Sequence, residues 1–507
     1  MARIVVIGAG MGAMTAAARL AVAGHRVVVY ERGETFGGAV GRVERDGFAF
    51  DTGPGLLQLP AVYRDLFVKT GKEPLEKCVE LSQVEPAVRH VFADGTAADL
   101  PNASRAGVGE ALDAALGDGA GERWAAFMNR AREAWDRTRR PLLEEPLWAD
   151  WKVFAEREPY PSVARKRVLR RERRAVTLGE IAEFELGDDP RLRALLEHFA
   201  LGAGLDPRTA PASAAILPYL EQTFGTWSVT GGMRALAQAV YERCLARRVE
   251  FVFGAAVTRI VEKDGRAAGV ELADGGVADA DFVVAGVAPA ALAELLPGVE
   301  IRAAEDAPAR SGMPSRLTVL LALSGARPEG APHRTVVHAA DRAAELACLF
   351  GGGDAMADRP TVTVTRPGDP ASVPDEAHEA VTLTATVPAF PGTPGQASRD
   401  VFAARAEQLI AHATRAVPDL RERLLWHEVR TPSDIAEATG AVGGAVPAPT
   451  LAAADGRHLH PSNSTRVQGL YAVGGWSHPG GGLPHAGMSG TLVAGLIVEG
   501  PEFRGSQ

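Results

Sequence analysis

Two glycine-rich turns, one near each end of the chain, contain the residues with the clearest chemical potential. The first is Gly8–Ala13 (GAGMGA), which follows the apolar run Arg3–Ile7 and precedes an alanine-rich helical pattern. A glycine turn between a buried strand and a helix brings free N–H groups and the positive end of the helix dipole to one point, where a phosphate binds. We therefore expect the chain to bind a dinucleotide through its pyrophosphate.

The positions of this turn have separate tasks. Gly8 permits the tight turn, Gly10 lets the backbone approach the pyrophosphate, and the small Ala13 lets helix and strand pack. Arg26–Tyr30 (RVVVY) then forms a second strand, and it is followed by Glu31. An acid at this place accepts hydrogen bonds from a ribose. Strand, helix, second strand and acid together predict a complete nucleotide-binding unit.

A second glycine pair, Gly37–Gly38, follows soon after and lets another backbone segment close on the dinucleotide. Nicotinamide dehydrogenases do not usually need such a pair, which favours FAD; Arg32 would suit the 2′-phosphate of NADP, the alternative. The segment Asp46–Pro54 (DGFAFDTGP) comes next. With it the chain resembles the two-dinucleotide-binding-domain flavoproteins, and more narrowly the phytoene desaturase (carotenoid dehydrogenase) branch of the amine-oxidase superfamily, where GFxFDxGP is typical.

The second glycine-rich turn follows the apolar strand pattern Gly469–Gly475, and a helix begins near Ala486. Its stretch His478–Pro484 (HPGGGLP) is typical of the desaturase branch, and the resemblance implies that it lies along the flavin. Either His478 or His485 could transfer a proton, since the reference pKa of histidine is about 6.5. The alternative is that both histidines fix the loop by hydrogen bonds.

The resemblance also identifies the remaining cofactor residues. Family members usually have arginine directly after the glycine pair, where this chain has Ala39, and the nearest arginine is Arg42. The residue matching Val257 holds the adenine through its backbone. The full set of expected FAD contacts is Gly8, Gly10, Met11, Gly12, Ala13, Glu31, Arg32, Gly37, Gly38, Ala39, Arg42, Gly53, Pro54, Gly55, Leu56, Val257, Gly474, Gly475, Pro484, His485, Gly487 and Met488.

In the middle of the chain the resemblance places Asp206–Arg234 near the substrate channel. Tyr219, Phe224 and Trp227 are therefore the candidate substrate contacts, with core packing as the alternative. Glu221 lies among apolar neighbours that could raise its pKa. It is, with His485, a candidate catalytic residue, and a salt bridge to an arginine is the alternative.

These motifs predict an α/β fold with a Rossmann-type FAD-binding domain, an α+β substrate domain and a helical lid or membrane-facing region. We expect three FAD-binding segments (1–102, 226–290 and 436–507), a helical substrate segment (103–225) and a substrate domain of mixed sheet and helices (291–435). The strands Leu317–Leu323 and Ala380–Val387 are expected in its sheet.

Composition limits the remaining possibilities. The chain has 507 residues, a net charge of −9 and 46% hydrophobic residues, which excludes wholesale disorder. Its mild acidity argues against nucleic acid as a partner. Cys78, Cys244 and Cys348 match no zinc spacing, and we expect no metal. No apolar run reaches about 18 residues, so we expect a cytoplasmic protein. The aromatic and basic residues of 148–174 form either a solvated helix face or a peripheral contact with the inner face of the membrane.

The predicted function is FAD-dependent desaturation, with a hydride passing from a C–H bond of an apolar polyene or isoprenoid to flavin N5. Oxygen or a quinone would re-oxidise the flavin. A flavin amine oxidase would commonly need a lysine near N5, and no lysine follows Lys263. A desaturase-like enzyme that oxidises, isomerises or saturates a specialised metabolite is the second alternative. A flavin-binding protein without enzymatic activity is the third.

Overall fold

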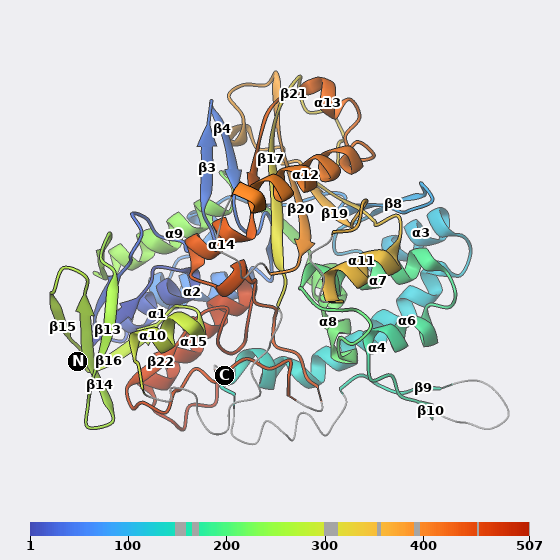
Figure 1. The fold of residues 1–507 in the computed structure, drawn as a ribbon. Coiled ribbons are helices and arrows are strands. Elements are labelled where there is room, and N and C mark those ends of the chain that lie inside the picture. The colour runs from blue at the N-terminus through green and yellow to red at the C-terminus, as the bar shows by residue number, and fades with distance from the viewer. Residues whose placement is uncertain are drawn as a thin grey trace.

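The fold joins three regions, which Figure 1 shows in one view. The computed structural model describes residues 1–147, 159–164, 172–298, 313–351, 356–389, 396–453 and 456–505. A parallel sheet with its helices lies at the left of Figure 1, a larger mixed sheet lies above, and a group of helices lies at the right. The predicted α/β class is confirmed. That helical group comprises α3 (Arg105–Leu116), α4 (Ala120–Arg139), α6 (Leu178–Glu185), α7 (Pro190–Gly202) and α8 (Ile216–Phe224).

The parallel sheet collects strands from separated parts of the chain. Its order is β12-β2-β1-β16-β22, and every neighbouring pair is parallel. The strands are β12 (Glu250–Val252), β2 (Arg26–Tyr30), β1 (Arg3–Ile7), β16 (Phe282–Ala285) and β22 (Leu470–Ala472). The turns after β1 and β22 therefore lie at the same edge of one sheet, because the carboxyl ends of parallel strands meet there.

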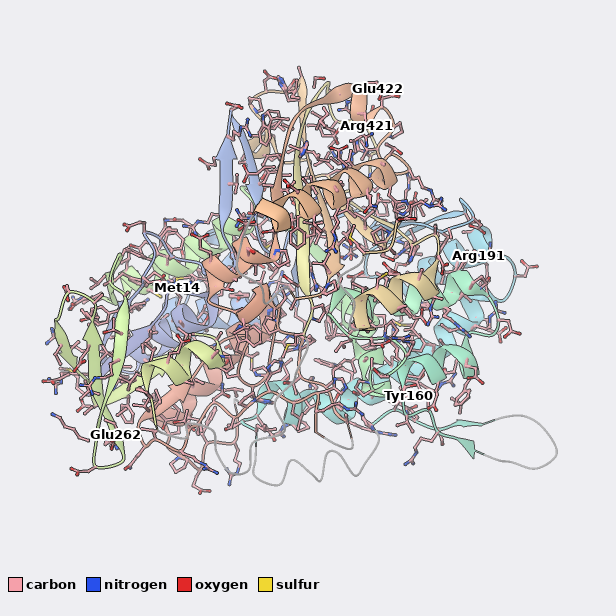
Figure 2. All side chains as sticks on the ribbon, in the orientation of Figure 1. Met14, Tyr160, Arg191, Glu262, Arg421 and Glu422 are labelled. Carbon is pink, nitrogen blue, oxygen red and sulfur yellow. The ribbon has the colours of Figure 1, made fainter. Side chains whose placement is uncertain are left out.

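Both faces of this sheet are buried, which explains why its strands read as continuous apolar runs. Ile4 and Val6 pack with α1 (Met11–Val22), α2 (Ala61–Gly71), α9 (Met233–Ala246) and α15 (Leu483–Val498). Met14 of α1, labelled in Figure 2, lies fully buried in this cluster. Val5 and Ile7 face the opposite way, toward α10 (Pro289–Leu295) and the sheet β13-β14-β15.

Helices α1 and α15 approach each other at backbone contact distance. A Cβ on Gly12 would lie 2.8 Å from the carbonyl oxygen of Ala486 and 2.9 Å from the Cα of Gly474. A Cβ on Gly490 would lie within van der Waals overlap of the Gly12 carbonyl oxygen. Glycine is therefore required on both helices, and the crossing brings the two glycine-rich turns side by side.

The larger sheet has seven strands in the order β21-β17-β20-β19-β18-β7-β8. These are β21 (Leu424–Arg430), β17 (Ser315–Ser324), β20 (His378–Val387), β19 (Val362–Thr365), β18 (Arg334–Val337), β7 (Val88–Val91) and β8 (Ala97–Leu100). Alternate residues of β17, β20 and β19 pack against α12 (Gln396–Ala413). On the other face, Phe48 and Phe50 of the β3–β4 hairpin pack against Leu320 and Ala322 of β17. The two predicted strands of this sheet are present.

The other elements connect these regions. They are β3 (Arg42–Arg45), β4 (Phe48–Asp51), β5 (Leu57–Gln58), β6 (Leu81–Gln83), β9 (Val163–Ala164), β10 (Glu172–Arg173), β11 (Thr226–Val229), β13 (Val257–Lys263), β14 (Arg266–Leu272), β15 (Val277–Asp279), α11 (Arg342–Phe350), α13 (Leu420–Arg423) and α14 (Pro432–Thr439). None of the helices in the described ranges is long and apolar enough to cross a membrane. Most of residues 148–174, the predicted membrane-facing patch, lies outside the described residues.

The α1–α15 crossing generates a stability prediction. Gly490→Ala adds one methyl group against the Gly12 carbonyl and the backbone of Ala16. We expect overpacking to lower the free energy of unfolding by about 1–3 kcal/mol, measured by urea denaturation. Gly202→Ala is the matched control, because a Cβ there meets no heavy atom within 4 Å. Equal stability of the two variants would contradict the tight crossing.

Candidate functional site

The turn after β1 has the geometry of a phosphate-binding turn. Gly8 has a φ of +88°, which favours glycine, and its N–H donates to the carbonyl of Tyr30 at 2.8 Å. Helix α1 then begins at Met11 with no side-chain cap and no acidic residue in its first turn. A Cβ on Gly10 would meet no heavy atom within 4 Å. Free N–H groups and open space for an anion therefore lie together, and Ala13 is buried beneath them.

Glu31 is fixed beside this turn by backbone groups. Its Oε2 accepts from the Ala9 N–H at 2.7 Å, and its Oε1 accepts from the Gly33 N–H at 2.7 Å. The Glu31 carbonyl accepts from Ala255, two residues before Val257 at the start of β13. The predicted ribose acceptor and the predicted adenine contact therefore lie near each other. Each carboxylate oxygen still has capacity for a ribose hydroxyl.

The second glycine pair packs directly on the first turn. Gly37 forms a parallel bridge with Gly10, and a Cβ on Gly38 would lie 3.1 Å from the Gly10 Cα. A third backbone segment joins them at Gly53. The Ala39 carbonyl oxygen lies so close to Gly53 that a Cβ there would overlap it. The predicted segment Gly53–Leu56 thus begins next to the glycine pair.

Arg234 of α9, which sequence reasoning missed, supports this loop. Its guanidinium donates to the carbonyls of Phe36 and Val40 and to the Thr35 hydroxyl, and lies 3.9 Å from the Phe36 ring centroid. It holds the loop that contains Ala39, where the family has arginine. The one signal in the sequence was the glycine pair Gly231–Gly232 just before Arg234. The role of this pair depends on a partner residue far away in the chain.

That partner is Asp51, the aspartate of the GFxFDxGP motif. Its partly buried carboxylate accepts from the N–H groups of Met233 at 2.8 Å and Arg234 at 3.3 Å. Burial raises the pKa of this carboxyl above its usual value, with the backbone hydrogen bonds acting in the opposite direction. Asp51 thus caps α9 and fixes the point from which Arg234 reaches back to the glycine loop.

The two arginines predicted as cofactor contacts point elsewhere. Arg42 donates to the carbonyls of Gly231 at 2.9 Å and Ala371 at 3.1 Å and pairs with Glu44. Arg32 donates to the Glu437 carbonyl near the end of α14. The hydrogen bonds of both guanidinium groups go to protein oxygens, and a cofactor role for either stays a prediction.

The C-terminal turn mirrors the first one. Helix α15 begins at Leu483 with no side-chain cap and no acidic residue in its first turn, and Pro484 occupies that turn. A Cβ on Gly474 would meet no heavy atom within 4 Å, whereas one on Gly475 would lie 3.0 Å from Pro447. The Gly474 N–H donates to the Ser489 hydroxyl at 2.9 Å. The turn therefore opens toward the same space as the N-terminal turn.

The first turn of α15 rests on α2. The Tyr63 hydroxyl donates to the Leu483 carbonyl at 2.9 Å, and a Cβ on Gly487 would lie 2.8 Å from Val62. Met488, the next predicted contact, packs partly buried against the helical region. This support fixes the direction of the helix dipole.

Both candidate histidines are buried and neutral. Burial lowers the pKa of each from 6.5 to about 4. His478 forms a hydrogen bond through Nε2 with the Glu145 carbonyl at 2.9 Å, which matches the loop-fixing alternative. His485 lies in the first turn of α15, next to the predicted flavin contacts. A proton-transfer role for His485 stays a prediction.

Glu221 is the anionic half of a buried ion pair. Arg334 donates to both of its carboxylate oxygens, to Oε1 at 2.5 Å and Oε2 at 2.9 Å, and Gln58 donates to Oε2 at 2.9 Å. The Glu221 side chain is only 5% exposed. The salt bridge that the sequence left open is present, and the catalytic alternative stays a prediction.

The candidate substrate residues lie around α8 and β11. Tyr219 and Phe224 have ring centroids 6.4 Å apart, and both lie near the Trp135 ring of α4. Tyr219 is 5% exposed, as expected for core packing, whereas Phe224 is 36% exposed. The Trp227 indole donates to the Phe224 carbonyl at 3.2 Å. This cluster is aromatic and apolar, and its substrate role stays a prediction.

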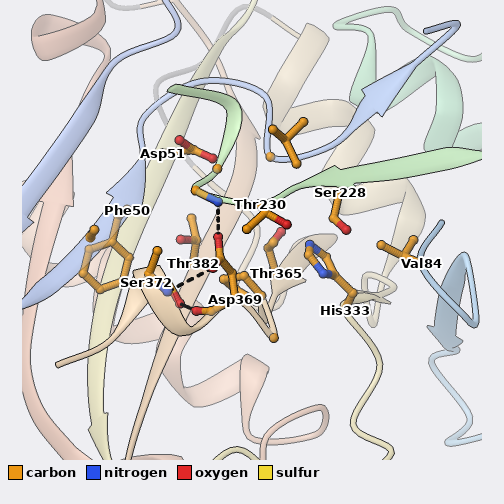
Figure 3. A pocket seen from close by; sticks show the side chains of 18 of the residues that line it. Phe50, Asp51, Val84, Ser228, Thr230, His333, Thr365, Asp369, Ser372 and Thr382 are labelled. Carbon is orange, nitrogen blue, oxygen red and sulfur yellow. Dashed lines mark hydrogen bonds between the residues drawn. The ribbon is translucent and has the colours of Figure 1, made fainter. Parts of the chain in front are cut away.

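A cavity of about 500 Å³ lies where the β3–β4 hairpin, β11 and the seven-stranded sheet meet, as Figure 3 shows from close by. Its lining includes Gly53 and Gly55, which belong to the predicted flavin segment. Most of its side chains are polar, in contrast to the aromatic cluster of α8.

Comparison with known proteins identifies the family. Residues 14–498 match the family described as flavin containing amine oxidoreductase. The chain belongs to this family. The 4,4'-diapolycopene oxygenase of Methylomonas sp is 30% identical over 98% of each chain. The hydroxyneurosporene desaturase of Rhodobacter capsulatus is 30% identical over 98% of this chain and 97% of the relative.

Solved structures of oxidoreductases share the fold. An oxidoreductase from Methanosarcina mazei superposes with a TM-score of 0.64 at 18% identity, over 97% of this chain and 99% of that one. Putrescine oxidase bound to putrescine has a TM-score of 0.60 at 13% identity, over 98% and 99%. The cofactor of this protein is FAD, as predicted, and the chain is an FAD-dependent oxidoreductase. The open helix N-termini, the glycine loops and Glu31 fit that cofactor.

The position of Arg234 generates a cofactor prediction. Arg234→Ala leaves the carbonyls of Phe36 and Val40 without a partner and loosens the glycine loop. We expect FAD to bind about 10-fold more weakly or worse, measured as the Kd from quenching of flavin fluorescence. Arg132→Ala, an exposed change on α4, is the control. Unchanged FAD affinity in Arg234→Ala would show that the loop does not need this arginine.

Proposed function

We propose that this protein oxidises a C–H bond of a long, apolar polyene or isoprenoid substrate, acting on CH–CH groups. The observation that supports this most is full-length similarity, over 98% of the chain, to relatives named for carotenoid oxygenation and desaturation. The apolar, aromatic surroundings of α8 suit such a substrate.

When bound, FAD would supply the hydride acceptor, and the protein supplies position, dryness and charge. The N-termini of α1 and α15 direct N–H groups and dipoles to one space, which favours negative charge there. The Gly8, Gly37 and Gly53 segments let backbone approach closely. The surrounding buried residues exclude water, which strengthens these electrostatic effects.

The proton lost from the substrate needs an acceptor or a route to water. Within the candidate pair, we propose His485 for this task, because Glu221 is held by Arg334 and Gln58. The His485 imidazole is neutral at physiological pH, so it can accept a proton at once. We assign His478 to loop geometry.

The alternatives differ in substrate. A flavin amine oxidase is disfavoured, since no lysine follows Lys263. A desaturase-like enzyme acting on another specialised metabolite uses the same site with a different ligand. We also propose that oxygen or a quinone re-oxidises the flavin and that the substrate is collected at a membrane surface.

Co-expression in cells that make phytoene tests the substrate class. We expect new absorption bands at longer wavelength in pigment extracts, because each added double bond extends the conjugation. The bands should vanish with Gly10→Glu, which places a carboxylate in the space for the pyrophosphate. Unchanged phytoene from a yellow, FAD-loaded protein would favour the specialised-metabolite alternative.

The pH dependence of kcat separates the two candidate bases. A base whose pKa is about 4 is neutral above that value, so kcat should be level near pH 7 and fall as the pH drops toward 4. We expect His485→Phe to lower kcat about 100-fold and remove this acid limb. Glu221→Gln should keep the limb and lower the melting temperature instead. The reverse pattern would assign the base to Glu221.

A further inference from the structure

The cavity of about 500 Å³ has a chemistry that a pure hydrocarbon does not need. Its volume lies in the range that holds a compact ligand or one end of a long molecule. One wall is formed by Thr365 of β19 and by Thr382 and Thr384 of β20. Figure 3 labels Thr365 and Thr382. Thr365 and Thr382 are direct cross-strand partners. Their neighbours in the strands face α12, so the threonines project from the opposite face of the sheet.

The acidic side chains that line this cavity already accept hydrogen bonds from backbone N–H groups. Asp369 accepts from the N–H groups of Gly231 at 2.5 Å and Ala371 at 2.9 Å, and Figure 3 shows it between these elements. Asp51 caps α9 as described above. Glu85 accepts from the N–H of Asn102 at 3.1 Å. None of the three needs a cationic ligand for its hydrogen bonds.

The cations of the cavity are likewise bound to carbonyl oxygens. Arg42 donates to Gly231 and Ala371. Arg327 donates to the carbonyls of Arg366, at 3.2 Å, and Ala331. Both guanidinium groups therefore hold the loops that form the cavity. Because the acids and the arginines are all bound to protein groups, the cavity has no preference for a strongly charged ligand.

Neutral hydrogen-bonding groups remain. The hydroxyls of Thr365, Thr382 and Thr384 have no side-chain partner among the described residues, and Thr230, labelled in Figure 3, also lines the cavity. His333 lines the same wall, and its Nε2 has no hydrogen-bond partner in the described part of the chain. Burial lowers the pKa of His333 to about 4, so the ring is neutral.

We propose that this cavity binds a neutral oxygenated end group of the substrate, a hydroxyl or a carbonyl, while the apolar remainder of the chain lies outside it. This inference rests on the proposed function. A hydrocarbon end in the same place would leave the threonine hydroxyls and His333 without partners, which is costly once water is excluded. Because Gly53 and Gly55 also line the cavity, the end group lies next to the predicted flavin segment.

The test uses the FAD-loaded protein and two polyenes of the same chain length, one unsubstituted and one with a single terminal hydroxyl. Their Kd values are measured from changes in the flavin absorption spectrum on titration in detergent. We expect the hydroxylated polyene to bind about 10- to 100-fold more tightly. The double variant Thr382→Val/Thr384→Val should reduce this preference to near unity while the Kd of the hydrocarbon stays unchanged.

Two further variants test whether the loss of preference comes from the loss of the threonine hydroxyls at the cavity. Thr382→Ser/Thr384→Ser keeps the hydroxyls and should keep the preference. Thr363→Val makes the same change on the same face of β19, outside the lining of the cavity, and should also keep it. Equal binding of both polyenes to the parent protein would overturn the inference and leave the proposed function intact. Binding of neither polyene would overturn both.

Discussion

The close contact between Gly12 and Gly490 is the constraint on which the site depends. Only at backbone contact distance do α1 and α15 place their N-termini around one space. Neither helix has an acidic residue or a side-chain cap in its first turn. Two positive dipole ends directed at one space are unfavourable until negative charge lies between them. The fold therefore keeps an electrostatic cost that the anionic cofactor relieves, and FAD binding should stabilise it.

A third helix, α9, differs from α1 and α15 at its N-terminus. The N-terminus of α9 is also near the site, but the partly buried carboxylate of Asp51 accepts two of its N–H groups. That internal cap fixes Arg234, which in turn holds the loop of the second glycine pair. The protein thus uses its own carboxylate to accept hydrogen bonds from the N-terminal N–H groups of the helix that positions the loop. It leaves uncapped the two helices that are predicted to meet the cofactor.

Sequence reasoning succeeded where the determining interactions are local. The unit from β1 to Glu31 could be predicted because apolar runs, glycines and the final acid lie within one short stretch. The strands β17 and β20 could be predicted from their apolar pattern. Arg234 and the ion pair of Glu221 could not be assigned in this way. Arg234 holds the glycine loop from nearly 200 residues away, and Arg334 is 113 residues from Glu221. Such partners depend on how distant segments pack.

The threonine face of the large sheet illustrates the same limit and its chemical meaning. Alternation along β20 predicts two faces, but only the packing of α12 decides which face is core and which faces the cavity. Elsewhere in the described interior, several buried carboxylates are paired with arginine, as in Glu379 with Arg366 and Glu197 with Arg342. An unpaired charged side chain in contact with an apolar substrate would lose its hydration, and no interaction with the substrate would compensate for this loss. Threonine hydroxyls and neutral imidazoles can distinguish an oxygen atom from a methyl group without that cost, which suits the proposed substrate, a molecule that is almost entirely hydrocarbon.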